Sequence, residues 1–483
     1  MKYHTSKHST SSSSLTIRTT TFFALCLLLS FILFFFSSTT RHHFSDPIFR
    51  SDSFEFSGDL REANFPWNKL CFGQPSEQLK LAVFSKTWPV GAAPGGMERH
   101  ASTLYTALAA RGHEIHVFTV PSDRNPYPDI HDGNLHVHFA SNDHGSVNCS
   151  LAFEIFHKEG KRRPFDYVHT ESVSLPHWRA KMVPGVAVTW HGIWYEIMHS
   201  KLFESLLGDA QGLVAGAESD LRDAMPRLIE EIKFFPSYTQ HVVISNSAAE
   251  VLVKIYQLPQ RNVHVILNGV DETKFVQDQD IGARFRQKHG VPTNASVVMG
   301  VAGRLVRDKG HPLLHAAFST IIKNYPGVFL LVAGTGPWGK RYSELGANVK
   351  VLGALEPSQL SQFYNAIDVF VNPTLRPQGL DLTLMEAMQC GKPVLTPNYP
   401  SITGTVVIND GFGYTFSPNV GSFVEELQRV ISDGPKILRR KGVTCKEYAV
   451  SMFTATKMAS AYERFFLCMK NDRYCQYPLP SDS

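Results

Sequence analysis

This sequence has few cysteines and only a small net charge. Seven cysteines in 483 residues are too few for a fold that depends on a disulfide framework. The chain has 47 basic and 43 acidic residues, and residues 1–45 contain four of the basic ones and no acid. The rest of the chain is therefore neutral and gives no indication of a nucleic-acid partner. A hydrophobic content of 43% is typical of a globular protein.

The sequence contains one Asp-x-Asp motif of the kind that binds metals, but without the apolar strand that such a site needs before it. Asp278-Gln279-Asp280 has Asp-x-Asp spacing, but such a site needs an apolar strand directly before it, and Lys274-Phe275-Val276-Gln277 stands there instead. Because a helical run follows, the two acids are predicted to lie at a solvated helix start. We therefore expect no metal site.

One long hydrophobic run lies near the start of the chain. Thr19 to Thr40 is uncharged, and as a helix it would span about 33 Å, enough to cross a bilayer. Basic residues precede it, which favours a cytosolic N-terminus. We expect a cytosolic tail (1–18), a retained transmembrane anchor (19–40) and a stem (41–77). A cleaved signal peptide and a transit peptide are the alternatives. The anchor predicts a single-pass type II protein of the Golgi membrane, or of the ER membrane.

A luminal location would bear on two kinds of residue. Asn148 and Asn294 each begin an acceptor triplet for glycosylation. Cys390 is expected to be buried in a helix. Five other cysteines could pair in a lumen, and the sequence favours no pairing among Cys71, Cys149, Cys445, Cys468 and Cys475.

The globular part opens with a strand, a glycine-rich loop and a helix. Leu79 to Ser85 is an apolar strand, Gly95 and Gly96 lie in the loop, and apolar residues recur at helical spacing from Met97 to Arg111. Ile115 to Val120 is the next strand, so this unit is typical of the start of a Rossmann-like domain. The dinucleotide fingerprint is absent from the unit, and NAD therefore has no support. Further strands are predicted at 167–169, 186–190, 242–244 and 263–267.

A second α/β unit begins at Val297 to Ala302. Gly303-Arg304-Leu305 and Lys309-Gly310 follow this strand, and Gly334 follows the strand at 328–333. Further strands are predicted at 349–352, 369–371 and 394–395, and helices at 312–324, 423–431 and 454–468. Together these elements predict a mostly parallel sheet.

Residues 371–396 carry the pattern around which the chain is organised. Asn372-Pro373 ends a strand, and Leu382 to Cys390 is predicted to be a helix with Gly391 at its C-terminal end. A loop that joins the carboxyl end of a strand to a helix N-terminus is where open α/β sheets bind anionic ligands. Gln378 lies in that loop, and Glu386 lies near the start of the helix.

The segment Glu386 to Val394 resembles the donor-binding signature of retaining glycosyltransferases with the GT-B fold, the large family that includes sucrose synthase and bacterial mannosyltransferases. Four more segments resemble motifs of this family in the same order, at Gly95–Arg99, Thr189–Gly192, Asn268–Asp271 and Gly303–Gly310. The upstream half of the signature departs from the family, with Gln378 where a glutamate is usual and Asp381 where a glycine is usual.

The resemblance implies an α/β protein with two Rossmann-like domains that face a cleft. It implies an acceptor domain at 78–272, a nucleotide-sugar domain at 273–445 and a helix at 446–470 that crosses back to the first domain. The implied reaction moves a sugar from a nucleotide sugar to a glycan or other acceptor, with retention of configuration and with neither metal nor cofactor. Fixed cations and helix N-termini would stabilise the charge on the leaving diphosphate.

The resemblance also implies roles for individual residues. Arg304 and Lys309 would bind the diphosphate, and Glu386 would accept hydrogen bonds from the ribose hydroxyls. Gln378 would bind the donor sugar without a charge. The implied catalytic residues are His191, Arg304 and Lys309. The implied donor-binding residues are Gly95, Gly96, Arg304, Lys309, Gly334, Gln378, Gly379, Leu380, Asp381, Leu382 and Glu386.

Two other functions remain open on the sequence. A non-catalytic Golgi protein that binds glycans or partners would keep the same fold. The change at Gln378 favours it, whereas the retained cations and His191 favour the enzyme. A soluble phosphorylase would need a pyridoxal lysine context that the sequence does not have, and it conflicts with the anchor.

Overall fold

The computed structural model describes residues 77–92, 94–209, 217–471 and 474. The predicted tail and anchor, and the predicted stem up to residue 76, lie outside these residues. Within the described part of the chain, no helix is both long and apolar enough to cross a membrane.

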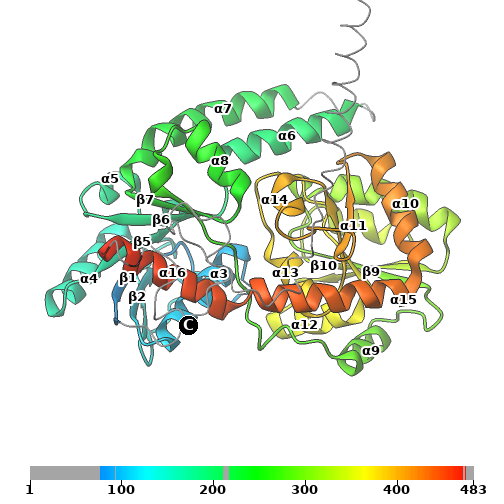
Figure 1. Cartoon of the computed structure of the whole chain (residues 1–483), viewed down its shortest axis with the longest axis horizontal. Helices are drawn as coiled ribbons and strands as arrows, with labels where there is room; N and C mark the ends of the chain where they lie inside the picture. The colour runs from blue at the N-terminus through cyan, green and yellow to red at the C-terminus, as the bar shows by residue number, and fades with distance from the viewer. Residues whose placement is uncertain (1–76, 93, 210–216, 472–473, 475–483) are drawn as a thin grey trace, which may run out of the picture. The chain divides into compact units, whose positions relative to one another are not determined.

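The first α/β domain is built on one twisted sheet (Figure 1). Over the described residues its strand order is β3-β4-β2-β1-β5-β6-β7-β8, and its neighbouring strands are parallel except for β3 and β4. The strands are β1 (Lys80–Phe84), β2 (Glu114–Thr119), β3 (Ile130–Asp132), β4 (Leu135–Phe139), β5 (Tyr167–Glu171), β6 (Val186–Trp190), β7 (Gln240–Val243) and β8 (Val263–Val265).

Helices connect these strands. The helices are α3 (Gly96–Ala110), α4 (Cys149–Arg162), α5 (His177–Ala180), α6 (Trp194–Asp209), α7 (Ala217–Phe234) and α8 (Asn246–Lys254). Because α3 buries Ala101, Leu104, Tyr105 and Leu108 at spacings of three and four residues, one apolar face of this helix covers the sheet. Figure 1 shows α6 and α7 running side by side, and the two helices contact each other along their length.

The second α/β domain is built on a parallel sheet. Over the described residues the strand order is β11-β10-β9-β12-β13-β14. The strands are β9 (Val297–Ala302), β10 (Val328–Ala333), β11 (Val349–Gly353), β12 (Val369–Val371), β13 (Val394–Pro397) and β14 (Gly413–Phe416). All six residues of β10 are buried, as expected for a parallel strand covered on both faces, which explains its continuous apolar run.

The second domain carries the remaining helices. They are α9 (Gln279–Lys288), α10 (His311–Asn324), α11 (Trp338–Ser343), α12 (Pro357–Ala366), α13 (Leu382–Gln389), α14 (Pro400–Thr403), α15 (Val420–Met452) and α16 (Ala455–Lys470). Asp278 is the N-cap of α9 and accepts a hydrogen bond from the Ile281 amide at 3.0 Å, so the predicted helix start at the Asp-x-Asp motif is confirmed.

The last helix leaves the second domain and packs on the first (Figure 1). Met458, Tyr462 and Phe466 of α16 are buried in the same apolar cluster as Leu104 and Leu108 of α3. At the rim of this contact, the Nε of Arg111 donates to Glu463 at 2.5 Å. Helix α16 is thereby part of the core of the first domain.

Several predicted elements need correction. The helix predicted at 423–431 is part of α15, which runs to Met452 with a break at Gly434, whose φ of 65° lies in the left-handed region just before Pro435. Strands β3, β4 and β14 were not predicted. Of the cysteines left open for pairing, Cys149 and Cys445 are free, and Cys468 is disulfide-bonded. Cys390 is buried as predicted.

Candidate active site

An ion pair lies in the loop between β12 and α13. Asp381 is the N-cap residue of α13, yet its side chain makes no cap hydrogen bond. Its Oδ1 lies 2.5 Å from the Nζ of Lys309, and the Nδ2 of Asn372 donates to its Oδ2 at 3.1 Å. Burial raises the pKa of Asp381, but the charge of Lys309 and its hydrogen bond outweigh burial, so the pKa is lowered. The predicted phosphate-binding lysine is therefore paired with a carboxylate of the chain itself.

A further cation, which the sequence did not predict, lies close to this pair. The Nε of Arg376 donates to Oδ2 of Asp308 at 3.0 Å, and its Nη2 lies 2.9 Å from the same oxygen. Arg304 has a side chain that is 65% exposed, and its Nη2 is 4.0 Å from the Asp308 carboxylate. Of the three cations Arg304, Lys309 and Arg376, the first is the most open to a ligand.

Glu386 is almost fully buried and is bound on both oxygens. The Nη1 of Arg99 donates to Oε1 at 2.5 Å, and the Tyr364 hydroxyl donates to Oε2 at 2.7 Å. Arg99 comes from α3 in the first domain, so this ion pair joins the two domains. Because each carboxylate oxygen can accept more than one hydrogen bond, Glu386 keeps capacity for the ribose hydroxyls that the resemblance assigns to it.

A pocket of about 500 Å³ lies beside this ion pair. Arg99 and Pro94 line it from the first domain, and Glu356, Leu382 and Glu386 line it from the second. A volume of this size is within the usual range for sites that bind small molecules. The pocket therefore has the place and size for the nucleoside part of a donor.

The predicted glycines have different surroundings. Gly95 precedes α3 and lies against the Glu98 carboxylate, where a Cβ would come within 2.7 Å of Oε2, whereas a Cβ on Gly96 would meet nothing within 4 Å. Neither glycine is among the residues that line the pocket. Gly334 has a φ of +132°, and a Cβ there would lie 1.8 Å from the Gly303 carbonyl oxygen. The close approach of two strand-end loops thus accounts for this glycine.

His191 belongs to a buried hydrogen-bonded cluster at the carboxyl ends of β5 and β6. Its Nε2 lies 2.5 Å from Oε2 of Glu171, and the Tyr105 hydroxyl donates to Oε1 of the same carboxylate. Burial raises the pKa of Glu171, but the charge of His191 and its hydrogen bond outweigh burial and lower this pKa to about 2. Since the carboxylate accepts a hydrogen bond from Nε2, Nδ1 is the ring nitrogen left for a further hydrogen bond.

His100 lies beside His191, with ring centroids 4.6 Å apart, and among the described residues its ring nitrogens make no hydrogen bond of good geometry, with Asn268 nearby. Burial lowers the pKa of His100 to about 3, and the charge of His191 adds to this effect. His100, Glu171 and His191 offer atoms of metal-ligand type within 4.8 Å of one another. The direct bond between Glu171 and His191 favours a cluster that orients His191 by hydrogen bonding.

The loop at 378–382 is tied to the first domain through its backbone. The Ser245 hydroxyl donates to the Gln378 carbonyl at 2.6 Å, and the Nδ2 of Asn268 donates to the Leu380 carbonyl at 3.2 Å. The Gln378 side chain is buried, and its Nε2 lies 3.2 Å from Nδ1 of His199 on α6. Gln378, Gly379 and His191 line one small cavity together.

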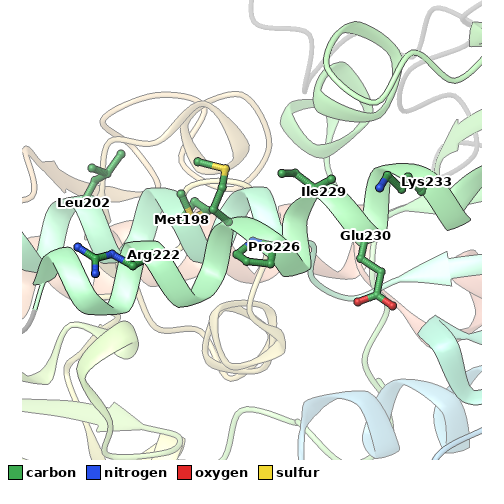
Figure 2. A pocket seen from close by; sticks show the side chains of 8 residues that line it. Met198, Leu202, Arg222, Pro226, Ile229, Glu230 and Lys233 are labelled. Atoms are coloured by element: carbon green, nitrogen blue, oxygen red, sulfur yellow. The ribbon is translucent and has the colours of Figure 1, made fainter.

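An apolar groove of about 780 Å³ runs along α6 and α7. Figure 2 shows Met198 and Leu202 from α6 beside Pro226 and Ile229 from α7. None of the predicted site residues lines this groove, and it shares no lining residue with the pocket at Glu386. It is therefore a separate surface of the first domain.

Two family models match this chain. Residues 94–274 match the model described as Glycosyltransferase Family 4, and residues 283–449 match the model described as Glycosyl transferases group 1. Together the two matches cover the first α/β domain from its glycine-rich loop and most of the second.

Prokaryotic glycosyltransferases are also similar to this chain in sequence. The chain is 26% identical over 377 residues to an uncharacterized glycosyltransferase of Methanocaldococcus jannaschii, a match that covers 74% of this chain and 90% of that protein. It is 26% identical over 348 residues to a D-inositol 3-phosphate glycosyltransferase of Acidothermus cellulolyticus, which covers 65% of this chain and 72% of that protein.

The fold has relatives among solved structures. Sucrose-phosphate synthase from Thermosynechococcus elongatus superposes with a TM-score of 0.65 and 20% identity, over 82% of this chain and all of that one. Anabaena HepE in complex with UDP-glucose superposes with a TM-score of 0.57 and 16% identity, over the same shares. At such identities these structures establish the fold. With the two family matches, they show a GT-B glycosyltransferase fold in which a Glycosyltransferase Family 4 region is followed by a Glycosyl transferases group 1 region.

Proposed function

We propose that this chain transfers a sugar from a nucleoside diphosphate sugar to a glycan or other acceptor, with retention of the anomeric configuration. The observation that carries the proposal is the group of three cations, Arg304, Lys309 and Arg376, in loops of the second domain. Glu386 lies in the same domain, and its ion pair with Arg99 of the first domain lines a pocket of nucleoside size. Retention follows from the resemblance of the donor-binding signature to that of retaining enzymes.

The cations give a physical route to breaking the donor bond. As the sugar leaves, charge develops on the diphosphate oxygens, and fixed cations stabilise that charge in place. Arg304 can bind two oxygens at once, whereas Lys309 acts as a point charge. The N-terminus of α13 adds a favourable dipole. The chain's own groups can therefore neutralise the leaving group, and we propose that neither a metal nor another cofactor takes part.

His191 would contribute as an oriented hydrogen-bonding group. Glu171 fixes its ring and its tautomer, and the ring lines the same cavity as Gln378. Nδ1 is thereby left for a hydrogen bond to the bound sugar or acceptor. We assign His191 this role on its position and on the resemblance.

The location we propose is the Golgi membrane, with residues 19–40 as a retained type II anchor and the catalytic domains in the lumen. The 22-residue uncharged run supports this location. Amino-terminal sequencing of the mature protein checks it, because a start near residue 40 would instead identify a cleaved signal.

The proposed activity is tested by a donor panel on the full-length protein in detergent. UDP, GDP and ADP sugars are added, and both thermal unfolding and the release of nucleoside diphosphate are measured. A donor at 100 times its Kd is expected to stabilise the folded state by about 2.7 kcal/mol. Solved relatives hold UDP-glucose and, in Arabidopsis starch synthase IV, ADP, which supports beginning with these bases.

The donor panel also separates the enzyme from a non-catalytic binding protein. An enzyme is expected to be stabilised by a nucleotide sugar and to release its diphosphate in an acceptor-dependent way. Stabilisation by free glycans, with no response to any nucleotide sugar, would instead identify a binding protein.

A further inference from the structure

Glu196 is a buried carboxylate to which neither the sequence nor the comparisons assign a role. It lies in the first turn of α6, five residues after His191, and its side chain is almost fully buried. Among the described residues its Oε1 accepts no hydrogen bond of good geometry, although the Gly379 backbone lies close enough to the carboxylate to lower its pKa in part. A buried oxygen without a donor is destabilising, so its presence calls for an explanation.

The surroundings of Glu196 connect it to the proposed site. It lines the small cavity together with His191, Gly192, Gln378 and Gly379. A Cβ on Gly379 would lie 2.7 Å from the Glu196 Oε1, so only a glycine leaves this oxygen room at that point of the loop. The first domain thus places an acid directly against the donor loop of the second.

A second unpartnered acceptor faces the same cavity. The Oε1 of Gln378 is also buried without a hydrogen-bond partner, while its Nε2 is held by His199. Two buried acceptors in one cavity require a ligand that brings hydrogen-bond donors. Sugar hydroxyls are such donors, whereas carboxylate or phosphate groups on a sugar would bring only further acceptors.

The charge around Glu196 fits a carboxylate that binds a neutral group. Burial raises the pKa of Glu196, and the charges of Arg376 and Lys309 oppose this rise. Arg376 and Lys309 are at the same time paired with Asp308 and Asp381. The cations therefore offset only part of the effect of burial, so the pKa of Glu196 stays above its usual value, and no direct ion pair occupies its Oε1 among the described residues.

Gln378 is already assigned to the donor sugar by the resemblance, and we propose that Glu196 of the first domain joins it in binding a hydroxyl group of that sugar and selects a neutral sugar over a uronic acid. This rests on the proposed function. The cavity has a volume of about 10 Å³, roughly the space of one water molecule. It lies between segments of the two domains, and it has room for one hydroxyl group of the sugar.

Calorimetry on the full-length protein tests the subsite. For wild type and variants, the Kd of a nucleoside diphosphate is compared with the Kd of the matching neutral nucleotide sugar, and their ratio gives the affinity contributed by the sugar. In Glu196→Ala we expect this ratio to fall by about tenfold or more, the effect of losing a hydrogen bond to a charged group. The Kd of the diphosphate alone is expected to stay within about twofold, which also shows that the variant is folded.

Two further variants sharpen the test. Glu196→Gln keeps an acceptor oxygen without the charge, so we expect a smaller loss and a weaker preference for a neutral sugar over its uronic acid. Glu231→Gln is the matched control, because Glu231 is a buried acid that binds the Trp194 amide and the Tyr256 hydroxyl but does not line the cavity. This control is expected to keep the wild-type ratio.

Each outcome decides the proposal. An unchanged sugar contribution in Glu196→Ala would show that the cavity holds only a water, and would overturn the subsite while leaving the proposed function intact. If Glu196→Ala also loses diphosphate binding, the test rests on Glu196→Gln. If that variant prefers a neutral nucleotide sugar over its uronic acid as strongly as wild type does, the proposal is overturned. If wild type binds diphosphate and nucleotide sugar equally, the subsite falls and the proposed function stands. If wild type binds neither, the proposed function falls and the subsite falls with it.

Discussion

Asp381 gives a sharp test of the diphosphate site. Its carboxylate lies 2.5 Å from the Nζ of Lys309, so a diphosphate that binds Lys309 must compete with it. Asp381→Asn keeps the size of the side chain and can keep the contact to Asn372, but it removes the negative charge. The variant is therefore expected to bind a nucleoside diphosphate more tightly than wild type does.

The size of the effect follows from Coulomb's law. Two unit charges about 5 Å apart interact by about 0.8 kcal/mol at the dielectric constant of water, and by about 3 kcal/mol at an effective value of about 20. Removing the repulsion between Asp381 and a phosphate charge should thus lower the Kd roughly 4- to 160-fold. Salt should reduce the gain, because the screening length is about 10 Å at 0.1 M ionic strength and about 3 Å at 1 M.

Calorimetry with a nucleoside diphosphate at low and high salt measures this change. Asp410→Asn is the control, since Asp410 is a highly exposed acid of the same domain that pairs with Arg429 and changes the net charge by the same amount. An affinity that is unchanged in Asp381→Asn, or lower at both salt concentrations, would refute the reasoning. The ion pair would then serve only to hold the start of α13.

Three other predictions use different parts of the structure. Arg304→Ala and Lys309→Ala should each weaken diphosphate binding by about 1.5–3 kcal/mol, measured by calorimetry, and no loss in a folded variant would remove that residue from the site. Arg99→Ala should lower the free energy of unfolding by about 3 kcal/mol in urea, because it leaves Glu386 buried without its cation, and Arg99→Ala with Glu386→Gln should recover part of it. Burial lowers the pKa of His169 and of His241 to about 4. Unfolding should therefore take up protons between about pH 6.5 and 4. As the pH falls through this range, the free energy of unfolding should decrease by up to about 1.4 kcal/mol per pH unit for each histidine. Urea titrations at pH 7, 6 and 5 check this, although the raised pKa of Glu231, about 7, contributes in the opposite direction between pH 4.5 and 7.

The sequence predicted those strands whose burial produces a continuous run of apolar residues. The strands at 186–190, 297–302, 328–333 and 369–371 have the predicted bounds, because a parallel strand covered on both faces is a continuous apolar run. Strand β4 was missed because histidines break the apolar run in Leu-His-Val-His-Phe, and strand β14 because Gly-Tyr-Thr-Phe is short and begins with glycine.

The site was predictable only as far as its motifs extend. Lys309 and Asp381 were both predicted, since each lies in a motif, but their pairing depends on how two loops meet. Arg99 binds Glu386 across 287 residues of sequence, and no spacing within either segment indicates that contact. Glu196 is similar, because an acid in the first turn of a helix is common and indicates only a favourable interaction with the helix dipole.

The arrangement of the cavity gives a physical reason for glutamine, in place of the usual glutamate, at position 378. Glu196 lines the same buried cavity, so a glutamate at position 378 would place two carboxylates where neither is solvated, and like charges in such a site oppose ionisation of both. With glutamine there, Nε2 is held by His199 while Oε1 stays available as an acceptor. The usual acid of the donor loop and the acid of α6 would thus exclude each other. On the subsite proposed above, glutamine at position 378 leaves Glu196 as the one carboxylate among the described residues of this cavity, an arrangement that is compatible with an active enzyme.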